Sequence, residues 1–328
     1  MSREPARVED RLDVALVAMP FAPVQTPSIG LGIVHAALAG RGLATRTFHA
    51  HIDFLEHIGV RDQLLLSTLT TKSAVADWLF TPVAFPEFDD DPEPYLRAVY
   101  DREPGLRGEP YADARARLLG LRARTPAFVD ARVDELLATG ARIVGCSSSF
   151  QQHVASLALL RRLRERAPAV VTLLGGPNCD TVMGRTTHRC FPWVDYVVCG
   201  EADLIVGDLA EQVLERGRDL DAEALGEGVL GPVHRASGYP RGDGPDDGVR
   251  ATADDLRAAP FPDYDDYFAR LDRSPLGDLV QPALAFEFSR GCWWGQRHAC
   301  RFCGLNLTGL RYRSRPPEAI ADALERLT

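Results

Sequence analysis

Three closely spaced cysteines are the residues of this sequence best suited to chemistry. They lie in SRGCWWGQRHACRFCGLN (Ser289–Asn306) with the spacing C-x7-C-x2-C, at Cys292, Cys300 and Cys303. Thiolates on one loop can bind a metal, and the glycines of this segment let the backbone turn around a bound group. The apolar run ALAFEF (Ala283–Phe288) comes just before them and predicts a strand, which would place the thiols at its carboxyl end.

Three interpretations of this cluster stay open on the residues alone. The thiols could be buried core cysteines, they could bind zinc together with His298, or they could hold an iron–sulfur cluster. Zinc usually takes four ligands in two close pairs, and His298 lies only two residues from Cys300, which is awkward for a tetrahedral site. A [4Fe–4S] cluster usually takes four thiolates, so three would leave one iron open to chelate a small molecule. Phe302 would then pack either in a core or against a bound purine.

Composition limits the class of protein. The chain has 328 residues, of which 45% are hydrophobic and 25% charged, proportions typical of globular proteins with about two domains. Its formal net charge of −9 and the lack of a basic tract speak against binding nucleic acid. The sequence shows no apolar run long enough to span a membrane and no secretory signal, so we expect a cytoplasmic protein. Its seven cysteines are then not expected to form disulfides.

Residues 1–216 alternate between short apolar runs and helical patterns. This pattern predicts an α/β fold with a doubly wound, mostly parallel sheet. The expected strands are Asp13–Met19, Leu43–His49, Ile143–Ser149, Val170–Leu174 and Val194–Cys199. The expected helices are Ile29–Gly40, Val154–Arg166, one near Asp203–Arg216 and, in the last part of the chain, Pro317–Leu327.

The remaining segments suggest an insertion, a linker and a second unit. Residues 53–138 read as a mainly helical insertion with helices at Phe54–Leu69 and Tyr111–Leu121. Residues 217–262 are rich in Gly, Pro and Asp, as linkers are. A new unit, 263–328, contains the cysteine cluster.

Small and polar residues follow three of the expected parallel strands, whose carboxyl ends meet at one edge of the sheet. Turn chemistry explains any one of these loops, but three along one edge favour a ligand groove. The sequence contains neither G-x-G-x-x-G nor G-x-x-x-x-G-K-[ST], so dinucleotide and phosphate-loop sites lack support. The candidate binding residues are Ser147, Ser148, Ser149, Gln151, Gly175, Gly176, Asn178, Gly200 and Glu201.

The cysteine segment resembles the cluster loop of radical S-adenosylmethionine (SAM) enzymes. The commonest spacing in that family is C-x3-C-x2-C, whereas CWWGQRHACRFCGLN is similar to the longer loop of the C-methyltransferases that mature ribosomally synthesised peptides (RiPPs). The resemblance implies that Cys292, Cys300 and Cys303 hold a [4Fe–4S] cluster and that its open iron binds SAM. The cofactors would supply the difficult chemistry, and the protein would supply position and exclusion of water.

The earlier segments resemble the cobalamin-binding domain of the same subfamily. The patterns are QTPSIGLG, VGCSSSFQQHVASLALLRRL, LLGGPNCDTVMG and DYVVCGEAD, and LRAAPFPDYDDYF (Leu256–Phe268) resembles the bridge between the two domains. The resemblance implies that the candidate binding residues above contact the ring and nucleotide tail of cobalamin. The D-x-H-x-x-G pattern is absent, so we expect no histidine ligand to cobalt, with His153 as the nearest exception.

The function implied by the resemblance is methylation of an unactivated carbon in a RiPP precursor peptide. The expected partners are this peptide and a reductant protein such as flavodoxin or ferredoxin. Few residues follow Cys303, so we expect an incomplete SAM barrel that is inactive alone, or is completed by a second chain. Two alternatives remain: a cobalamin-binding module or split-enzyme subunit without its own catalysis, and a cobalamin radical SAM enzyme that does not methylate.

Overall fold

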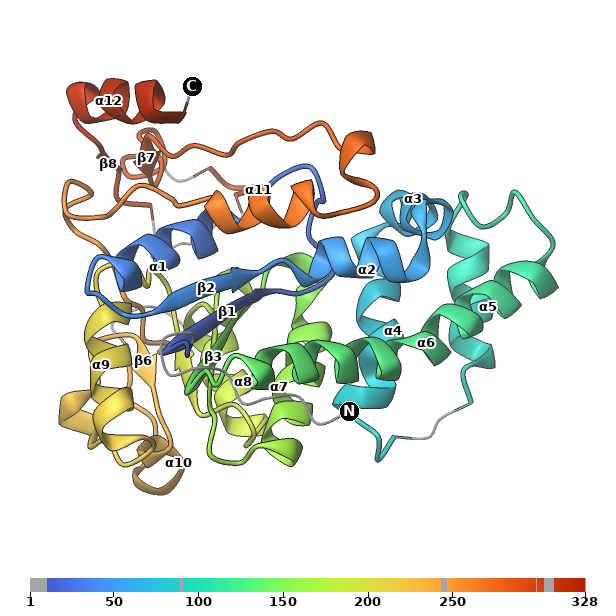
Figure 1. The fold of residues 1–328 in the computed structure, drawn as a ribbon, viewed down its shortest axis with the longest axis horizontal. Coiled ribbons are helices and arrows are strands. Elements are labelled where there is room, and N and C mark those ends of the chain that lie inside the picture. Colours follow the sequence, from blue (N-terminus) through green and yellow to red (C-terminus); the bar gives the residue numbers. More distant parts are fainter. Residues whose placement is uncertain (1–10, 89–90, 243–246, 299, 304–309, 328) are drawn as a thin grey trace.

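The computed structural model describes residues 11–88, 91–242, 247–298, 300–303 and 310–327. The first ten residues and residues 299 and 304–306 of the cysteine motif therefore lie outside the described part. The described residues contain a six-stranded sheet with helices on both faces and, at the end of the chain, a small hairpin unit (Figure 1). None of the described helices combines the length and apolar character needed to cross a bilayer.

The sheet has the strand order β2-β1-β3-β4-β5-β6, and β1 to β5 are parallel. This is the flavodoxin-like order, with an antiparallel strand added at one edge, so the predicted α/β class with a mostly parallel sheet is confirmed. The strands are β1 (Val14–Ala18), β2 (Thr45–Phe48), β3 (Ile143–Ser147), β4 (Val171–Gly175), β5 (Tyr196–Val198) and β6 (Val229–Leu230).

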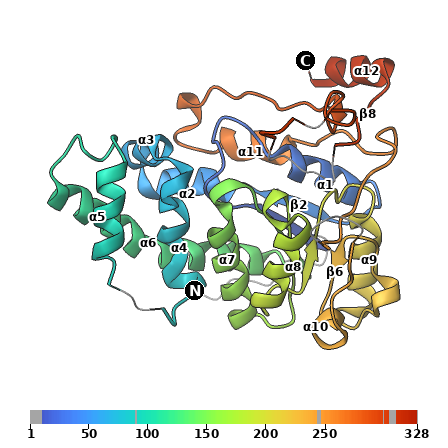
Figure 2. The ribbon, with the colours of Figure 1, turned by 180° about the vertical axis from the view of Figure 1, so that it is seen from behind.

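Alternate residues of each strand bury into different cores on the two faces of the sheet. On β1, Val14 and Leu16 pack with α1 (Ile29–Ala39) and α9 (Val206–Arg216). Ala15 and Val17 pack on the other face, where α7 (His153–Arg166) and α8 (Thr181–Cys190) lie in front of the sheet in Figure 2. Because both faces are covered, β1, β3, β4 and β5 are largely apolar and were recognisable as short apolar runs, whereas β2 has the sequence TRTF and is partly exposed.

The expected insertion is helical. Its helices are α2 (Ala50–Ile58), α3 (Val60–Thr68), α4 (Val75–Ala84), α5 (Glu93–Arg102) and α6 (Tyr111–Ala138). The single helix expected over Phe54–Leu69 is divided at Gly59, whose φ of 87° is incompatible with a continuous helix. The helix expected at Tyr111–Leu121 continues to Ala138, because Phe128 packs on Phe54 (4.9 Å between ring centroids) and anchors the later turns.

The segment 217–262, expected to be a linker, instead completes the sheet. Its β6 pairs antiparallel with β5, α10 (Val233–Ser237) follows, and Ala251 bridges to Gly200. A strand of two residues is too short to show alternation, so composition misled the prediction here. The helix α8 was also missed, since its sequence TVMGRTTHRC contains few apolar residues.

The prediction of a strand at Ala283–Phe288 is wrong. This described segment is irregular, and β7 (Ser289–Arg290) begins after it and pairs antiparallel with β8 (Arg313–Ser314). The segment is instead anchored by single contacts, such as the hydrogen bond from the Ala283 N–H to the Gln25 carbonyl (2.8 Å). The unit also contains α11 (Asp265–Asp272) and α12 (Pro317–Leu327), the latter as predicted. In Figure 1 the hairpin and α12 lie above α1.

A buried carboxylate, Asp195, holds the amino ends of β4 and β5 together. It accepts hydrogen bonds from the Thr172 N–H (2.9 Å) and from Arg218 Nε (2.7 Å), and it also pairs with Arg164. Burial by itself would raise the pKa of Asp195, but the hydrogen bonds from Arg218, Thr172 and Arg164 outweigh it, so the pKa lies below its ordinary value.

Replacing Asp195 by Asn should therefore destabilise the sheet. We expect Asp195→Asn to lower the free energy of unfolding by about 3 kcal/mol at pH 7, because two arginines lose their carboxylate. A carboxylate with a depressed pKa contributes stability above roughly pH 4 and loses it as the pH falls through the folded-state pKa, so the difference should shrink in acid. Urea unfolding at pH 7 and pH 3 measures both effects, and equal stability at pH 7 would contradict this account.

Candidate functional site

A cavity of about 340 Å³ opens at the carboxyl edge of the sheet. Its floor is formed by Leu16 of β1, Gly145 of β3 and Leu173 of β4, and its walls include the first turns of α1 and Val206 of α9. From β1 the chain crosses to β2 on one side, and from β3 it crosses to β4 on the other side. Ligands of open α/β sheets bind where the direction of these connections changes in this way. The cavity thus occupies the expected place for a ligand.

The missing side chain at Gly145 keeps this cavity open. Gly145 lies in the middle of β3, between Leu16 and Leu173 on the neighbouring strands. A Cβ at this position would lie 3.3 Å from Leu16 Cδ2 and 3.6 Å from Leu173 Cδ2. Any larger residue would therefore have to displace its neighbours or fill the floor.

Five of the nine predicted binding residues line the cavity: Ser147, Gly175, Gly176, Gly200 and Glu201. Two of the glycines also have a purely structural reason to be there. Gly176 has a φ of 93°, and a Cβ would lie 2.7 Å from the Ser148 carbonyl oxygen. Gly200 has a φ of 94°, and a Cβ would lie 2.4 Å from the Ala251 carbonyl oxygen. Close backbone packing thus requires both glycines, whatever the cavity binds.

The other four predicted residues do not line the cavity, because they bind the protein itself. Asn178 Nδ2 donates to Ser148 Oγ (3.0 Å) and to the Phe150 carbonyl (2.8 Å). Ser149 forms a capping box with Gln152. The side-chain oxygen of Gln151 accepts a hydrogen bond from the Ala76 N–H of α4 (3.2 Å). These contacts fix the loops after β3 and β4 to each other and to the insertion.

His153, considered as an exception for cobalt, also has partners within the protein. Its Nδ1 lies 3.0 Å from Ser148 Oγ and its Nε2 lies 3.3 Å from Thr187 Oγ1. Burial lowers its pKa, so the ring is held neutral between two hydroxyls.

The sequence prediction missed most of the charged groups at the mouth of the cavity. These are Asp180, Asp203, Arg250, Glu287 and Arg290, which join Glu201 there. They come from distant segments, and nothing in their spacing indicates a common site. Asp180, Asp203, Glu287 and Arg290 lie inside segments quoted above, but none of them was named as a site residue.

These charges form a compact ion-pair network. Arg290 Nη1 lies 3.0 Å from Glu201 Oε2 and 2.5 Å from Asp203 Oδ2, while its Nε contacts Glu287 (2.9 Å). Arg313, outside the cavity lining, binds both oxygens of Glu201 at 2.8 and 2.9 Å. Burial would raise the pKa of Glu201, but hydrogen bonds from Arg313, the Ala253 N–H and Arg290 lower it below its ordinary value. Glu201 is thus held as a carboxylate between the two arginines.

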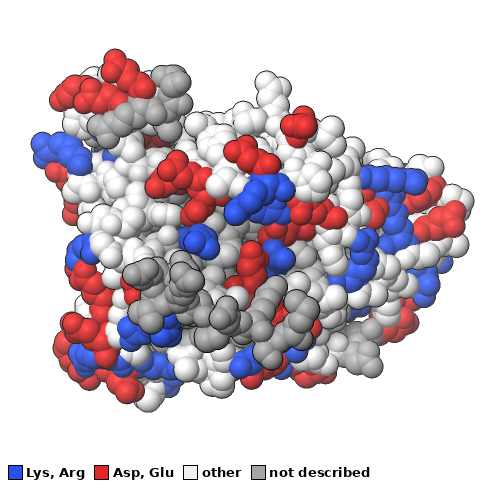
Figure 3. Space-filling model, in the orientation of Figure 1, with Lys and Arg blue, Asp and Glu red and all other residues white. Residues whose placement is uncertain are grey.

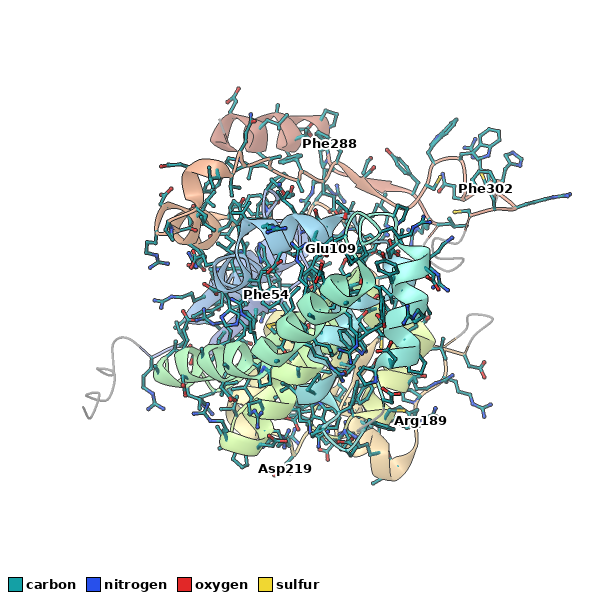
Figure 4. All side chains as sticks on the ribbon, turned by 90° about the vertical axis from the view of Figure 1, so that its right-hand side faces the viewer. Phe54, Glu109, Arg189, Asp219, Phe288 and Phe302 are labelled. Carbon is teal, nitrogen blue, oxygen red and sulfur yellow. The ribbon has the colours of Figure 1, made fainter. Side chains whose placement is uncertain are left out.

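The three cysteines of the cluster lie on the hairpin that joins β7 and β8. Cys292 is exposed, and Cys300 and Cys303 are half-buried. The Gly295 N–H donates to Cys292 Sγ (3.1 Å). Phe302 is 92% exposed, and Figure 4 shows it projecting from the body of the protein.

The donor chemistry of this hairpin fits an iron–sulfur cluster, with three thiols between β7 and β8 and an N–H directed at one of the sulfurs. Among the described residues, however, no three His, Cys, Asp or Glu side chains converge on one point as metal ligands. The same holds for the zinc alternative, in which His298 instead packs against Trp294 (5.1 Å between ring centroids). The thiols therefore remain candidates by chemistry, without a coordination geometry.

Three other cysteines are core residues. Cys146, Cys179 and Cys199 are buried, and burial raises the pKa of Cys146 and Cys199 to about 12. These thiols stay protonated and inert.

The face drawn in Figure 3 shows no continuous basic band among the described residues. On the face drawn in Figure 3, the described arginines are interspersed with Asp and Glu. The expectation that this chain does not bind nucleic acid stays a prediction.

No protein-family model matches the chain, and no curated protein matches it. The argument for function therefore rests on the residues and their geometry.

Asn178→Ala should separate loop stability from ligand binding. Since Asn178 joins two loops and does not line the cavity, we expect a loss of about 1 kcal/mol in the free energy of unfolding. We expect no change beyond about twofold in the affinity of any ligand that binds the cavity. Urea unfolding and equilibrium dialysis measure the two quantities. A stable variant with greatly weakened binding would show instead that Asn178 contacts the ligand.

Proposed function

We propose that this chain binds cobalamin at the carboxyl edge of its sheet and holds a [4Fe–4S] cluster and SAM on the hairpin, as part of a radical SAM C-methyltransferase acting on a ribosomally synthesised peptide. One observation carries the proposal. Arg290, two residues before Cys292, lines the mouth of the cavity at the sheet edge. The two candidate cofactor regions are therefore adjacent, as a reaction that uses both cofactors requires.

The shape of the cavity supports a nucleotide-sized group. About 340 Å³ suits a flat aromatic base with part of its sugar, and the apolar floor of Leu16, Gly145 and Leu173 would pack on its faces. A corrin ring is too large for this volume, so it would lie outside, over the loops that follow the strands.

The chemistry of the mouth supports an amide-bearing ligand. Glu201, Asp203 and Glu287 are acceptors, and the edge of cobalamin carries primary amides that donate hydrogen bonds.

The chain's own residues would then bind, orient and shield. When bound, cobalamin would supply the methyl group, and SAM at the cluster would supply the radical that activates the substrate carbon. Cys292, Cys300 and Cys303 would hold the cluster. Phe302 would cover a face of a bound purine, and the ion pairs at the mouth would keep the two regions together. The peptide, its reductant protein and a second chain that completes the barrel remain predictions from the resemblance.

A cobalamin-binding module without its own catalysis is the second candidate. It is favoured by one observation: the described thiols do not converge on a common metal position. The two candidates share the cavity and differ only at the hairpin, so the experiments below address each region separately.

Filling the floor of the cavity should abolish cobalamin binding. We expect Gly145→Leu to weaken the binding of hydroxocobalamin at least roughly tenfold, because the added side chain occupies the floor. The matched control is Gly120→Leu on α6, where a Cβ meets nothing within 4 Å and affinity should be unchanged. Equilibrium dialysis followed by absorption spectroscopy measures the affinity, and circular dichroism verifies folding. Equal affinity of both variants and the wild type would place the ligand elsewhere.

Removing one thiol should remove the cluster. After anaerobic reconstitution with iron and sulfide, we expect the wild-type chain to bind about four irons and to become visibly coloured. Cys303→Ala should lose most of this iron and colour, whereas Cys190→Ala, an exposed cysteine on α8, should keep both. Iron and acid-labile sulfide analysis distinguishes a cluster from zinc. A colourless wild-type protein that carries zinc at these thiols would refute the proposal for the hairpin.

A further inference from the structure

The cavity at the sheet edge changes its chemistry with depth. The strand register places Leu16, Gly145 and Leu173 side by side, at what we call the inner level. Ser147 and Gly175, which are also paired, stand two residues further along the same strands, roughly 7 Å closer to the mouth. All of these residues line the cavity. Along the strands, the lining thus changes from apolar to polar toward the mouth.

The described residues of the inner level offer a ligand no hydrogen-bonding group. The side chains of Leu16 and Leu173 are apolar and Gly145 has none, while the backbone groups of these residues face paired neighbouring strands. Tyr196 of β5 is the next residue in this register, and its hydroxyl donates to the Gly217 carbonyl (2.8 Å). The inner level is therefore an apolar floor.

Bound water cannot replace the missing hydrogen-bond partners. On the side of the amino ends of the strands, the inner level borders a second void of about 10 Å³. This void is lined by apolar residues such as Val14, Ile143 and Val171, and by Tyr196, whose hydroxyl is already bound. A buried water needs at least two polar partners. A polar atom of a ligand that reached the floor would thus lose its hydrogen bonds to solvent without compensation.

This gradient restricts which edge of a flat ligand can enter first. The entering edge must be hydrocarbon, whereas polar atoms are accommodated at the mouth, where Ser147, Glu201 and Arg290 lie. A purine nucleotide does not meet this condition, because ring nitrogens or an exocyclic group lie along the edges of the base away from its sugar. A benzimidazole nucleotide meets it, since the sugar is attached to the imidazole ring and the opposite edge is a benzene ring.

We propose that the cavity selects a bicyclic aromatic base with a hydrocarbon leading edge and rejects purines, and that Leu16, Gly145 and Leu173 determine this specificity. The ligand class is a benzimidazole nucleotide, to which the dimethylbenzimidazole end of cobalamin belongs. That this nucleotide is part of a corrinoid rests on the proposed function, whereas the selection of an apolar base does not.

The first test compares three corrinoids, each in its hydroxo form, on the full-length chain. They are cobalamin, its analogue with adenine in place of dimethylbenzimidazole, and cobinamide, which has no base. By equilibrium dialysis, we expect cobalamin to bind roughly tenfold to a hundredfold more tightly than the adenine analogue, because the purine edge would be left without partners. The adenine analogue should bind no more tightly than cobinamide, since its base stays outside the cavity.

A polar group at the floor should reduce this preference. Leu173 is only half-buried, because its side chain faces the cavity. Leu173→Asn nearly keeps the shape of the side chain and adds an amide that can pair with a purine edge. We expect the ratio of the two affinities to fall at least roughly fivefold. Leu173→Ile, the matched apolar control, should keep the wild-type ratio. An unchanged ratio in a folded Leu173→Asn variant, as verified by circular dichroism, would overturn the role of Leu173.

Free bases test the floor without a corrinoid and without a variant at Leu173. The wild-type chain is titrated with 5,6-dimethylbenzimidazole and with adenine at slightly basic pH, where both are uncharged. We expect the benzimidazole to bind at least roughly tenfold more tightly. Gly145→Leu should remove this difference, because the added side chain meets Leu16 and Leu173 and fills the floor.

The outcomes distinguish this inference from the proposed function. Equal binding of cobalamin and its adenine analogue, with cobinamide weaker, would mean that the base enters without selection, which overturns the inference. Equal binding of all three corrinoids would place the base outside the cavity and overturn it as well. If no corrinoid binds, the proposed function fails, while the free bases still decide the specificity of the cavity. A preference for the benzimidazole that Gly145→Leu removes supports the inference, and adenine binding as tightly, or neither base binding, refutes it.

Discussion

The burial of Glu201 between two arginines is the interaction on which the relation between the two parts of the chain depends. An ionised carboxylate beside the core is costly unless it is fully paired, and Glu201 meets this demand with Arg290, Arg313 and the Ala253 N–H. The arginines come from β7 and β8, so the charge of Glu201, which follows β5, is paired with them only when the hairpin lies against the sheet. Fold and candidate site are thus joined by the same charges.

The parallel sheet explains why a cavity exists at this edge. Right-handed crossovers bring the loops that follow the parallel strands to the same edge of the sheet. The helices α1 and α9 cover one face of the sheet, and the cavity lies between them and Gly145 of β3. The walls are apolar because both faces of a parallel sheet are buried. The polar groups therefore concentrate at the mouth, where the C-terminal hairpin supplies Arg290 and the segment before it supplies Glu287. This arrangement combines an apolar slot with directional hydrogen-bond acceptors, the usual composition of a small-molecule site.

The sequence pattern predicted those residues of the candidate site that directly follow a parallel strand. Ser147, Gly175, Gly176, Gly200 and Glu201 follow parallel strands directly, and they line the cavity. Ser148, Ser149, Gln151 and Asn178 occur in the same loops, but their side chains bind neighbouring backbone or side-chain groups. A sequence does not reveal which of two adjacent polar side chains turns inward, because that depends on loop-to-loop contacts. The wrong strand at Ala283–Phe288 has a similar cause: its apolar residues pack singly, as when Phe286 stacks on Phe261, and do not pair with a strand.

The sequence by itself determined the alternation of strands and helices, the spacing of the three thiols and the edge of the sheet at which a ligand would bind. Each of these depends on residues close together in the chain, where periodicity and loop position are legible. Only the tertiary structure decided that β6 completes the sheet, that Arg290 and Arg313 meet Glu201, and that Asp180 and Arg250 reach the same mouth. Those contacts join residues separated by tens of positions, and they are selected by the cost of leaving a buried charge or a sheet edge without a partner.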